Sequence, residues 1–381
     1  MTYAATLALP DAAAILRDAA SVTLLTHAKP DGDAFGSVVA LAAALNHLGT
    51  TTHAAFAPPV PDTFADMPGH DLAITTHDPA DLPDTDLLVV VDTGASAQLG
   101  PLAPAFDRHH AAGRPSLIVD HHLHGDLPAT HQLIDATRAA NCELIAELIQ
   151  HLAPTLLTPT PTPQAAAKQS AAAGIVAGTP ANPTSTNPIP HSLYLGIASD
   201  TGWFRFPNTS PATHRLAATL IELGVDHANL YTRSENHTRP QKLALVTAAL
   251  NSLEYLHGGR VALMTLTADD FARTGALYEE TERIVDYPKI VGSTHAVALI
   301  TEVVTSTGQA LTRVSLRSKP AAPQGPPAID VAAIAATLGG GGHFHAAGIK
   351  LPGPITEHVT DIRNAISAGL ADSSTPQDIA G

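Results

Sequence analysis

The chain contains very little cysteine: Cys142 is the only one among its 381 residues. A single cysteine excludes a disulfide within the chain, which fits a reducing compartment. Long apolar runs are also missing, and none approaches the roughly 18 residues that a transmembrane helix needs. The first 18 residues lack the basic start of a secretory signal. We therefore expect a cytoplasmic protein that does not contact membranes.

Basic residues are scarce as well. The chain has 20 lysines and arginines against 35 acidic residues, which gives a formal net charge of −15. Proteins that grip long duplex nucleic acid normally present a basic face, so this balance argues against such a partner. It does not exclude a small phosphorylated substrate, because bound divalent cations reverse the local potential. Histidine is abundant, with 21 residues, so only histidines spaced with carboxylates are informative.

The sequence does have the composition of a globular protein. Hydrophobic residues make up 45% of the chain, and its length predicts two or three domains. Strand-like runs alternate with helix-like segments in the first half. The predicted strands are Ser21–Thr26, Leu87–Val91, Ser116–Val119 and Leu193–Ala198, and the predicted helices are Gly36–Leu48 and Asn141–Leu152. This alternation predicts an α/β fold with a mostly parallel sheet.

The domain organisation follows from changes in composition. We expect a catalytic domain over residues 1–237, interrupted by an insertion rich in proline, alanine and threonine at about 155–190, with a short helix at 167–177. A linker helix is expected within 238–254, after a hinge near Gly224–Pro240. A smaller α/β domain is expected over 255–370, followed by a frayed tail at 371–381. Its predicted elements are strands Val261–Leu266, His295–Val303 and Ala310–Leu316 and the helix Val331–Leu338.

Acidic residues and histidines follow each predicted strand of the first domain. The set comprises His27, Asp31, Asp33, Asp92, Asp120, His121, His122 and Asp200. Each of them has an ordinary alternative as a turn residue or a helix N-cap. In an open parallel sheet, however, the carboxyl ends of the strands share one ligand-binding edge. Such a set is large enough for two divalent cations that share a carboxylate, as in two-metal phosphoryl transfer. Mixed Asp and His ligands favour Mn²⁺, with Mg²⁺ or Co²⁺ as alternatives.

The order of these motifs, with the literal sequence Asp120-His121-His122, resembles the DHH phosphoesterase family over nearly the whole chain. The C-terminal half is similar to the DHH-associated nucleotide-binding domain. It carries VSLRS at Val314–Ser318, Asp330-Val331, and GGGGHFHAAG at Gly339–Gly348. This pairing resembles the branch of nanoRNases and pAp phosphatases, and so does Thr201–His214.

The resemblance implies a role for each residue. His27 and Asp31 would hold one metal, Asp33, His121 and Asp200 the other, and Asp92 would bridge both. His122 would lie near the scissile phosphate, with Asp120 orienting a histidine. The residues expected to bind substrate are Arg317, Gly340, Gly341, Gly342, His343 and Arg205. We expect the loop Gly339–His343 and Arg317 to face the metal residues across a cleft.

The function that this resemblance implies is a Mn²⁺-dependent phosphoesterase. Its substrates would be short RNA, as for a nanoRNA exonuclease, or the 3′-phosphate of pAp, and a homodimer is one option for its assembly. Cleavage of cyclic dinucleotides or their linear products is the alternative within the same chemistry. A pyrophosphatase and a DNA exonuclease fit less well, because the glycine-rich GGGGH segment and the acidic composition argue against them. A non-catalytic nucleotide sensor would lack a metal ligand, and none is missing here.

Overall fold

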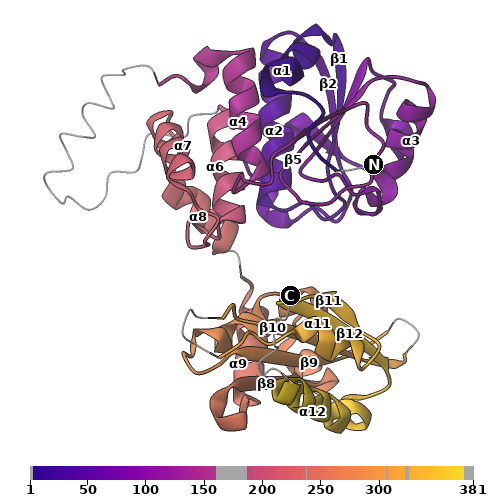
Figure 1. The fold of residues 1–381 in the computed structure, drawn as a ribbon, viewed down its shortest axis with the longest axis vertical. Coiled ribbons are helices and arrows are strands. Elements are labelled where there is room, and N and C mark those ends of the chain that lie inside the picture. The colour runs from indigo at the N-terminus through magenta and orange to yellow at the C-terminus, as the bar shows by residue number, and fades with distance from the viewer. Residues whose placement is uncertain (1–2, 160–186, 237, 306–307, 322–325, 373–381) are drawn as a thin grey trace, which may run out of the picture. The chain divides into compact units, whose positions relative to one another are not determined.

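The computed structural model describes residues 3–159, 187–236, 238–305, 308–321 and 326–372. The chain divides into two compact units, Met1–His237 and Thr238–Gly381, each with its own sheet covered by helices (Figure 1). The expected α/β fold is therefore confirmed. The helix predicted at 167–177, most of the insertion at 155–190 and residues 373–381 lie outside the described residues.

The first unit is built on a six-stranded parallel sheet of order β3-β2-β1-β4-β5-β6. Its strands are β1 (Ser21–Leu25), β2 (Thr51–Phe56), β3 (Ala73–Thr75), β4 (Leu87–Val91), β5 (Ser116–Asp120) and β6 (His131–Ile134). The order of connection reverses between β1 and β4. In doubly wound sheets, ligands bind at such a switch point, beyond the carboxyl ends of the strands.

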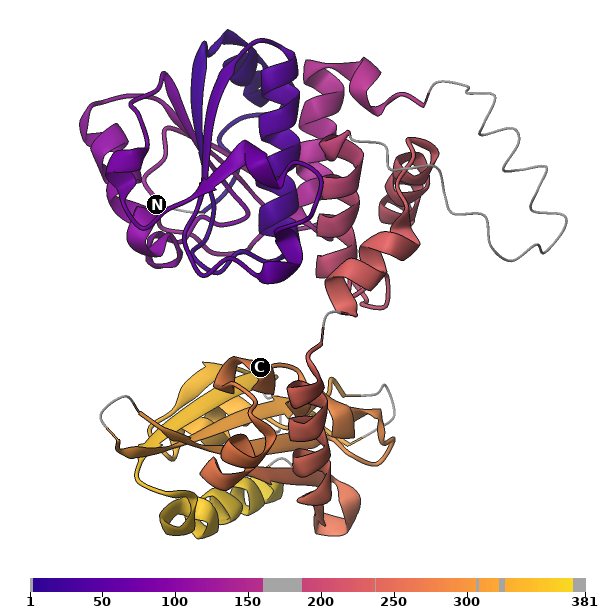
Figure 2. The same ribbon diagram turned by 180° about the vertical axis from the view of Figure 1, so that it is seen from behind.

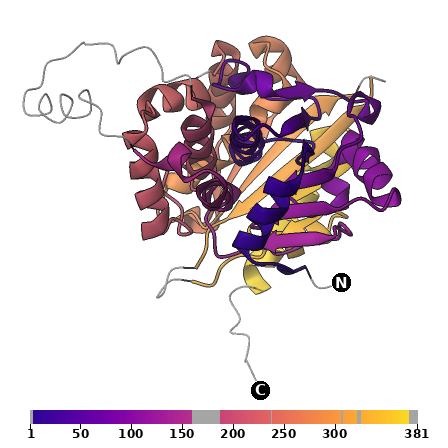
Figure 3. The same cartoon turned by 90° about the horizontal axis from the view of Figure 1, so that it is seen from above.

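Helices cover both faces of this sheet. The helices α1 (Leu9–Asp18), α2 (Gly32–His47), α4 (Asn141–Leu152) and α6 (Pro188–Asp200) share one hydrophobic core with one face, and α3 (Ala103–Ala111) packs on the other. The helices α7 (Pro211–Glu222) and α8 (His227–Glu235) pack outside α6, away from the sheet (Figure 3). Among the described residues, no helix is both long and apolar enough to cross a membrane.

The prediction of a strand at Leu193–Ala198 was wrong, because this segment belongs to helix α6. Every residue from Ile189 to Ala198 is buried. A helix that is buried on all sides is apolar on all sides, so its sequence lacks the 3.6-residue periodicity of a surface helix and resembles a buried strand. Asp200 therefore lies at the end of a helix, whereas the other acidic motifs follow strands.

The second unit contains a mixed six-stranded sheet of order β11-β12-β10-β9-β8-β7, in which only β8 and β9 pair in parallel. Its strands are β7 (Glu254–Leu256), β8 (Val261–Leu266), β9 (Ala296–Val304), β10 (Ala310–Ser318), β11 (Gly341–His343) and β12 (Ala346–Pro352). One face packs on α11 (Val331–Ala336) and α12 (Ile355–Asp372). The other packs on α9 (Pro240–Asn251), α10 (Ala268–Thr274) and the 3-10 helix η9 (Ile284–Ile290) (Figure 2).

Candidate metal centre

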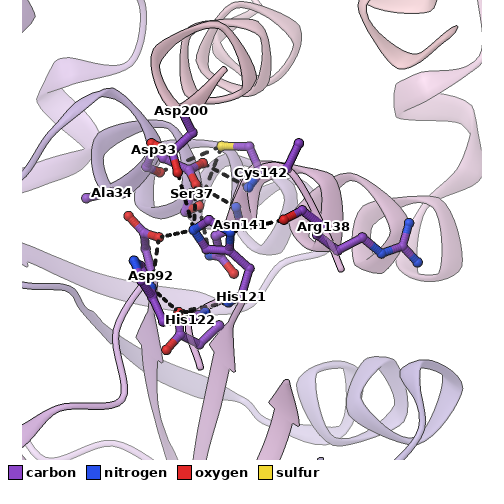
Figure 4. Close-up of polar contacts among 12 residues, drawn as sticks. Asp33, Ala34, Ser37, Asp92, His121, His122, Arg138, Asn141, Cys142 and Asp200 are labelled. Atoms are coloured by element: carbon purple, nitrogen blue, oxygen red, sulfur yellow. Dashed lines mark hydrogen bonds and ion pairs between the residues drawn. The ribbon is translucent and has the colours of Figure 1, made fainter. Parts of the chain in front are cut away.

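The acidic residues and histidines predicted from the sequence converge at the carboxyl ends of three adjacent strands. His27 follows β1, Asp92 follows β4, and His121 follows β5. Asp33 reaches the same place from the first turn of α2, and Asp200 from the last residue of α6. Figure 4 shows the carboxylates of Asp33, Asp92 and Asp200 around the ring of His121.

One group of possible metal ligands comprises His27, Asp31 and Asp92. The Nε2 atom of His27 lies 3.5 Å from Oδ2 of Asp92 and 4.0 Å from Oδ1 of Asp31. Asp31 is also the N-cap of α2, because its Oδ1 accepts hydrogen bonds from the amides of Asp33 and Ala34, each at 3.0 Å. A carboxylate has several lone pairs, so the capping role leaves room for a metal bond.

The second group comprises Asp33, His121 and Asp200. The Nε2 atom of His121 lies 3.3 Å from Oδ2 of Asp200, 3.4 Å from Oδ1 of Asp92 and 3.8 Å from Oδ2 of Asp33. The other ring nitrogen, Nδ1, lies 3.3 Å from the carbonyl oxygen of Arg138. A carbonyl only accepts, so in a neutral ring Nδ1 carries the hydrogen and the lone pair of Nε2 faces the carboxylates, as in a metal-binding histidine.

Two buried atoms in this cluster indicate that the residues fit a cation. Oδ1 of Asp92 and Nε2 of His121 are 3.4 Å apart, and neither has a hydrogen-bond partner in the described part of the chain. An unsatisfied buried polar atom costs about 1–3 kcal/mol. Two ligand atoms about 2.1 Å from one cation, at roughly 90–110° to each other, are about 3.0–3.5 Å apart. A divalent cation would therefore satisfy both atoms.

The electrostatics indicate the same need for positive charge. Burial lowers the pKa of His121, but the carboxylates of Asp200 and Asp92 outweigh burial and raise this pKa to about 11. Burial and the charges of Asp92 and Asp200 raise the pKa of Asp33 well above its usual value. Both shifts arise because several negative groups share a site with little water. Bound cations would neutralise that charge.

The local backbone fixes two of these carboxylates. Asp33 accepts the amides of Asn141 (2.5 Å) and Cys142 (2.9 Å), the first residues of α4. Asp92 has a φ of 61°, a left-handed conformation that costs most residues about 1–2 kcal/mol but that aspartate and asparagine adopt more readily. Its amide donates to the carbonyl of Val119 at 3.0 Å. The turn directs its carboxylate toward both ligand groups.

Asp120 belongs to neither ligand group and instead contacts His122. It is fully buried and accepts hydrogen bonds from Nδ1 of His122 at 2.7 Å and from the amides of His121 and His122 at 2.8 and 3.2 Å. The ring of His122 is about half exposed, and its Nε2 atom has no hydrogen-bond partner among the described residues. This geometry orients the ring and leaves Nε2 available to a ligand.

Sequence reasoning missed Tyr3, whose hydroxyl donates a hydrogen bond to Asp120. The tyrosine ring lies against Gly94 and Gly125. A Cβ atom at either glycine would come within 2.3 Å of it. Asn141 was missed too. In the amide orientation that satisfies its neighbours, it donates to the carbonyl of Val119 and accepts from the amide of Asp92 at 3.2 Å. The closeness of Gly94 and Gly125 to the tyrosine ring is visible only in the structure.

The structure does not bring Arg205 into either ligand group. It is exposed and follows a strained turn in which Gly202, Trp203 and Phe204 all have positive φ. Its Nε donates to the carbonyl of Gly202 at 2.6 Å. The turn begins two residues after Asp200 and presents Arg205 at the surface.

The other predicted substrate residues all lie in the second unit. Arg317 and His343 both pair with Ala346, so they flank it on one face of the sheet. The glycine run was expected to be a loop, but Gly341–His343 forms strand β11. Gly340 and Gly342 permit this close pairing, because a Cβ atom at either would lie 2.4 Å from a carbonyl oxygen of β12.

Comparison with known proteins defines the class. Residues 21–179 match the model of the DHH family, N-terminal domain. The bifunctional oligoribonuclease and PAP phosphatase NrnA of Thermus thermophilus is 26% identical over 334 residues, covering 87% of this chain and 84% of that protein. Residues 21–179 therefore resemble a DHH-family N-terminal domain, and the protein is a phosphoesterase, a hydrolase.

Solved structures agree with the fold. The crystal structure of an exopolyphosphatase-related protein from Bacteroides fragilis matches with a TM-score of 0.77 and 19% identity, covering 98% of this chain and 100% of that one. A pGpG-specific phosphodiesterase from Vibrio matches with a TM-score of 0.43 and 13% identity, covering 92% and 99% of the two chains. At that score the likeness carries no information on substrate.

Proposed function

We propose that this phosphoesterase hydrolyses short oligoribonucleotides and the 3′-phosphate of pAp, using two divalent cations with Mn²⁺ preferred. The observation that carries the proposal is the pair of unsatisfied atoms, Oδ1 of Asp92 and Nε2 of His121, buried among carboxylates. The similarity to NrnA, whose name records oligoribonuclease and PAP phosphatase activities, supports this choice of substrates.

In this proposal each of the two ligand groups would hold one cation. His27 and Asp31 would serve the first, and Asp33, His121 and Asp200 the second. Asp92 would serve both, since its Oδ2 faces His27 and its Oδ1 faces His121. Bound there, divalent cations would supply positive charge for the phosphate and would lower the pKa of a water molecule.

His122 and Asp120 handle the proton in this scheme. The hydrogen bond from His122 to Asp120 raises the pKa of His122, which favours the protonated ring. With Nδ1 engaged by Asp120, the hydrogen on Nε2 is the one available to the leaving oxygen. Asp120 thus acts as a positioning residue, and His122 contacts the substrate.

The test is a substrate panel with added Mn²⁺: pAp, a short RNA, a short DNA, a cyclic dinucleotide and pyrophosphate. We expect turnover of pAp and short RNA, with loss of more than about a hundredfold in Asp92→Asn. Asparagine keeps the left-handed backbone at this position, so the variant should melt like the native protein. Preferred hydrolysis of the cyclic dinucleotide would contradict the proposed substrates.

The same variant tests the bridging role. Calorimetric titration with Mn²⁺ should show two sites in the native protein and weaker binding at both sites in Asp92→Asn. Wild-type turnover of Asp92→Asn in excess Mn²⁺ would refute the bridging role.

A further inference from the structure

Three basic residues lie side by side at one end of the second sheet. Arg260 directly precedes β8, His295 directly precedes β9, and Lys319 directly follows β10. The amide of His295 donates to the carbonyl of Arg260, and the amide of Lys319 to that of His295, both at 2.8 Å. These bonds continue the strand pairing by one residue, so the three are neighbours across three strands. We call them the basic row.

The charges of Arg260 and Lys319 act on the histidine that lies between them. The pKa of His295 is lowered first by burial and then by the positive charges of Arg260 and Lys319. The pKa of Lys319 is lowered by burial and by the charge of Lys289, which itself pairs with Asp286 at 3.0 Å.

Nothing in the described part of the chain neutralises this row. None of its members forms an ion pair with a described carboxylate. The Nε atom of Arg260 is buried without a hydrogen-bond partner among the described residues, and Nζ of Lys319 donates to the carbonyl of Val291 at 2.7 Å. Acidic residues outnumber basic ones by 35 to 20 in this chain, so an unneutralised cationic row is unusual in its context.

The basic row adjoins the surface that carries Arg317 and His343. Side chains alternate along a strand, so Lys319 and Arg317 lie on the same face of the sheet, about 6.6 Å apart along it. Arg317 and His343 flank Ala346 on that face. The three residues of the basic row, together with Arg317 and His343, therefore offer positive charge or hydrogen-bond donors to one ligand surface.

We propose that the basic row binds a terminal phosphate of the nucleotide substrate, so that the enzyme selects nucleotides with a phosphomonoester besides the bond it cleaves. The inference rests on the proposed function. A phosphomonoester carries about −1.5 to −2 charges at pH 7, more than a phosphodiester. An arginine, a lysine and a histidine together match the larger charge. Arg260 supplies a planar fork of donors for phosphate oxygens, and Lys319 a point charge.

The test compares pAp with adenosine 3′-phosphate, which differ only in the 5′-phosphate. With the full-length protein and Mn²⁺, we expect kcat/KM to favour pAp. In Lys319→Gln this preference should fall by about tenfold or more. Lys350→Gln is the matched control, since Lys350 is an exposed lysine on the same face of the sheet. It lies four residues beyond Ala346 in β12, which is about 13 Å from Ala346 along the strand. Lys350→Gln should retain the native preference.

If both substrates are hydrolysed and Lys319→Gln keeps the native preference for pAp, the basic row does not bind the terminal phosphate. The proposed function would then still stand. An equal loss in Lys350→Gln would indicate a general charge effect and would also overturn the basic row. If Lys319→Gln fails to fold, His295→Gln takes its place with the same expectation.

Absence of turnover would contradict the proposed function rather than the basic row. The row is then tested by calorimetric titration of pAp and adenosine 3′-phosphate into the native and variant proteins. Weaker binding of pAp alone in Lys319→Gln supports it, and equal binding of pAp in both proteins overturns it.

Discussion

Tyr3 contacts Asp120, the proposed partner of His122, although it lies outside every motif found in the sequence. Its hydroxyl donates to Asp120, which in turn accepts from Nδ1 of His122. Loss of the hydroxyl would remove one of the donors that fix Asp120, while the ring would still fill the space over Gly94 and Gly125. Removing the hydroxyl alone therefore tests the orientation of His122 without changing the packing of the N-terminal segment.

Tyr3→Phe should lower kcat for pAp by about tenfold, because partners behind a functional histidine typically contribute tenfold to a hundredfold. KM should change little, since the residues that bind the nucleotide are untouched. The melting temperature should stay close to native. Steady-state kinetics with Mn²⁺ measure both constants. Tyr255→Phe, at a half-exposed tyrosine of β7, is the control. A native kcat in Tyr3→Phe would remove the positioning role.

The sequence predicted the ligand residues because each carries a local signal. Asp92 and His121 directly follow strands of buried residues, and this pattern is visible within a window of ten residues. Tyr3 and Asn141 have no such signal, since their partners lie on other elements. Tyr3 contacts Asp120, and Asn141 contacts Asp33 through its amide and Asp92 through its side chain. The left-handed conformation of Asp92 was not predicted either, because aspartate adopts it only where the surrounding structure imposes it.

Close packing of helices places Asp200. A Cβ atom at Gly196 of α6 would lie 2.2 Å from Sγ of Cys142 and 2.7 Å from Oδ1 of Asp33. Helix α6 therefore approaches α2 and α4 more closely than any larger residue would allow. Burial and the charge of Asp33 raise the pKa of the Cys142 thiol, which keeps this sulfur protonated and inert.

Gly196→Ala should destabilise the protein by about 1–3 kcal/mol, the usual cost of overpacking a dense core. It should also weaken Mn²⁺ binding, because the added methyl group displaces Asp33 or shifts the helix that ends in Asp200. Urea unfolding and Mn²⁺ titration measure the two effects. Gly292→Ala is the control, since a Cβ atom there meets nothing within 4 Å. Equal stability of the two variants would contradict this account of the packing.

The helices and strands were predicted where the local sequence distinguishes them, by the periodicity of an amphipathic helix or by a run of β-branched residues. The helix Asn141–Leu152 and the strand Leu87–Val91 have the predicted bounds. The buried helix α6 was mistaken for a strand, because a short apolar run does not distinguish a helix from a strand. The strand β11 was mistaken for a loop, because glycine has little strand propensity. Asp200 was still identified as a site residue, since an acidic residue at the end of a buried element stands out whether that element is a strand or a helix.

The two units differ in the chemistry that they offer. The first contains the carboxylates and histidines that fit cations, and the second the arginine, lysine and histidine side chains that suit phosphate. The α/β class was predicted from alternating elements along the chain. Three expectations stay predictions, because no local pattern in the sequence specifies them. They are the orientation of Gly339–His343 and Arg317 toward the proposed metal ligands, the homodimer and the cytoplasmic location.

This division of chemistry between the two units predicts that substitutions in the second unit affect nucleotide binding and spare hydrolysis of a substrate without a nucleoside. Arg317→Ala and His343→Ala should each raise KM for pAp by about tenfold, the usual effect of losing one hydrogen bond to a charged group. Bis-p-nitrophenyl phosphate, which has no nucleoside, should be hydrolysed at close to native rates. Arg273→Ala, at an exposed arginine of α10, is the control. Equal losses on both substrates would mean that Arg317 and His343 serve the chemistry or the fold.

Strand β11 also bears on how the protein behaves at high concentration. It forms one edge of the second sheet, is exposed along its whole length, and consists of two glycines and a histidine. An exposed edge invites strands from other molecules when it is long and rich in β-branched residues. Three residues with little strand propensity offer such strands almost no template. The glycines of this short edge strand thus protect the second sheet against aggregation along its exposed edge.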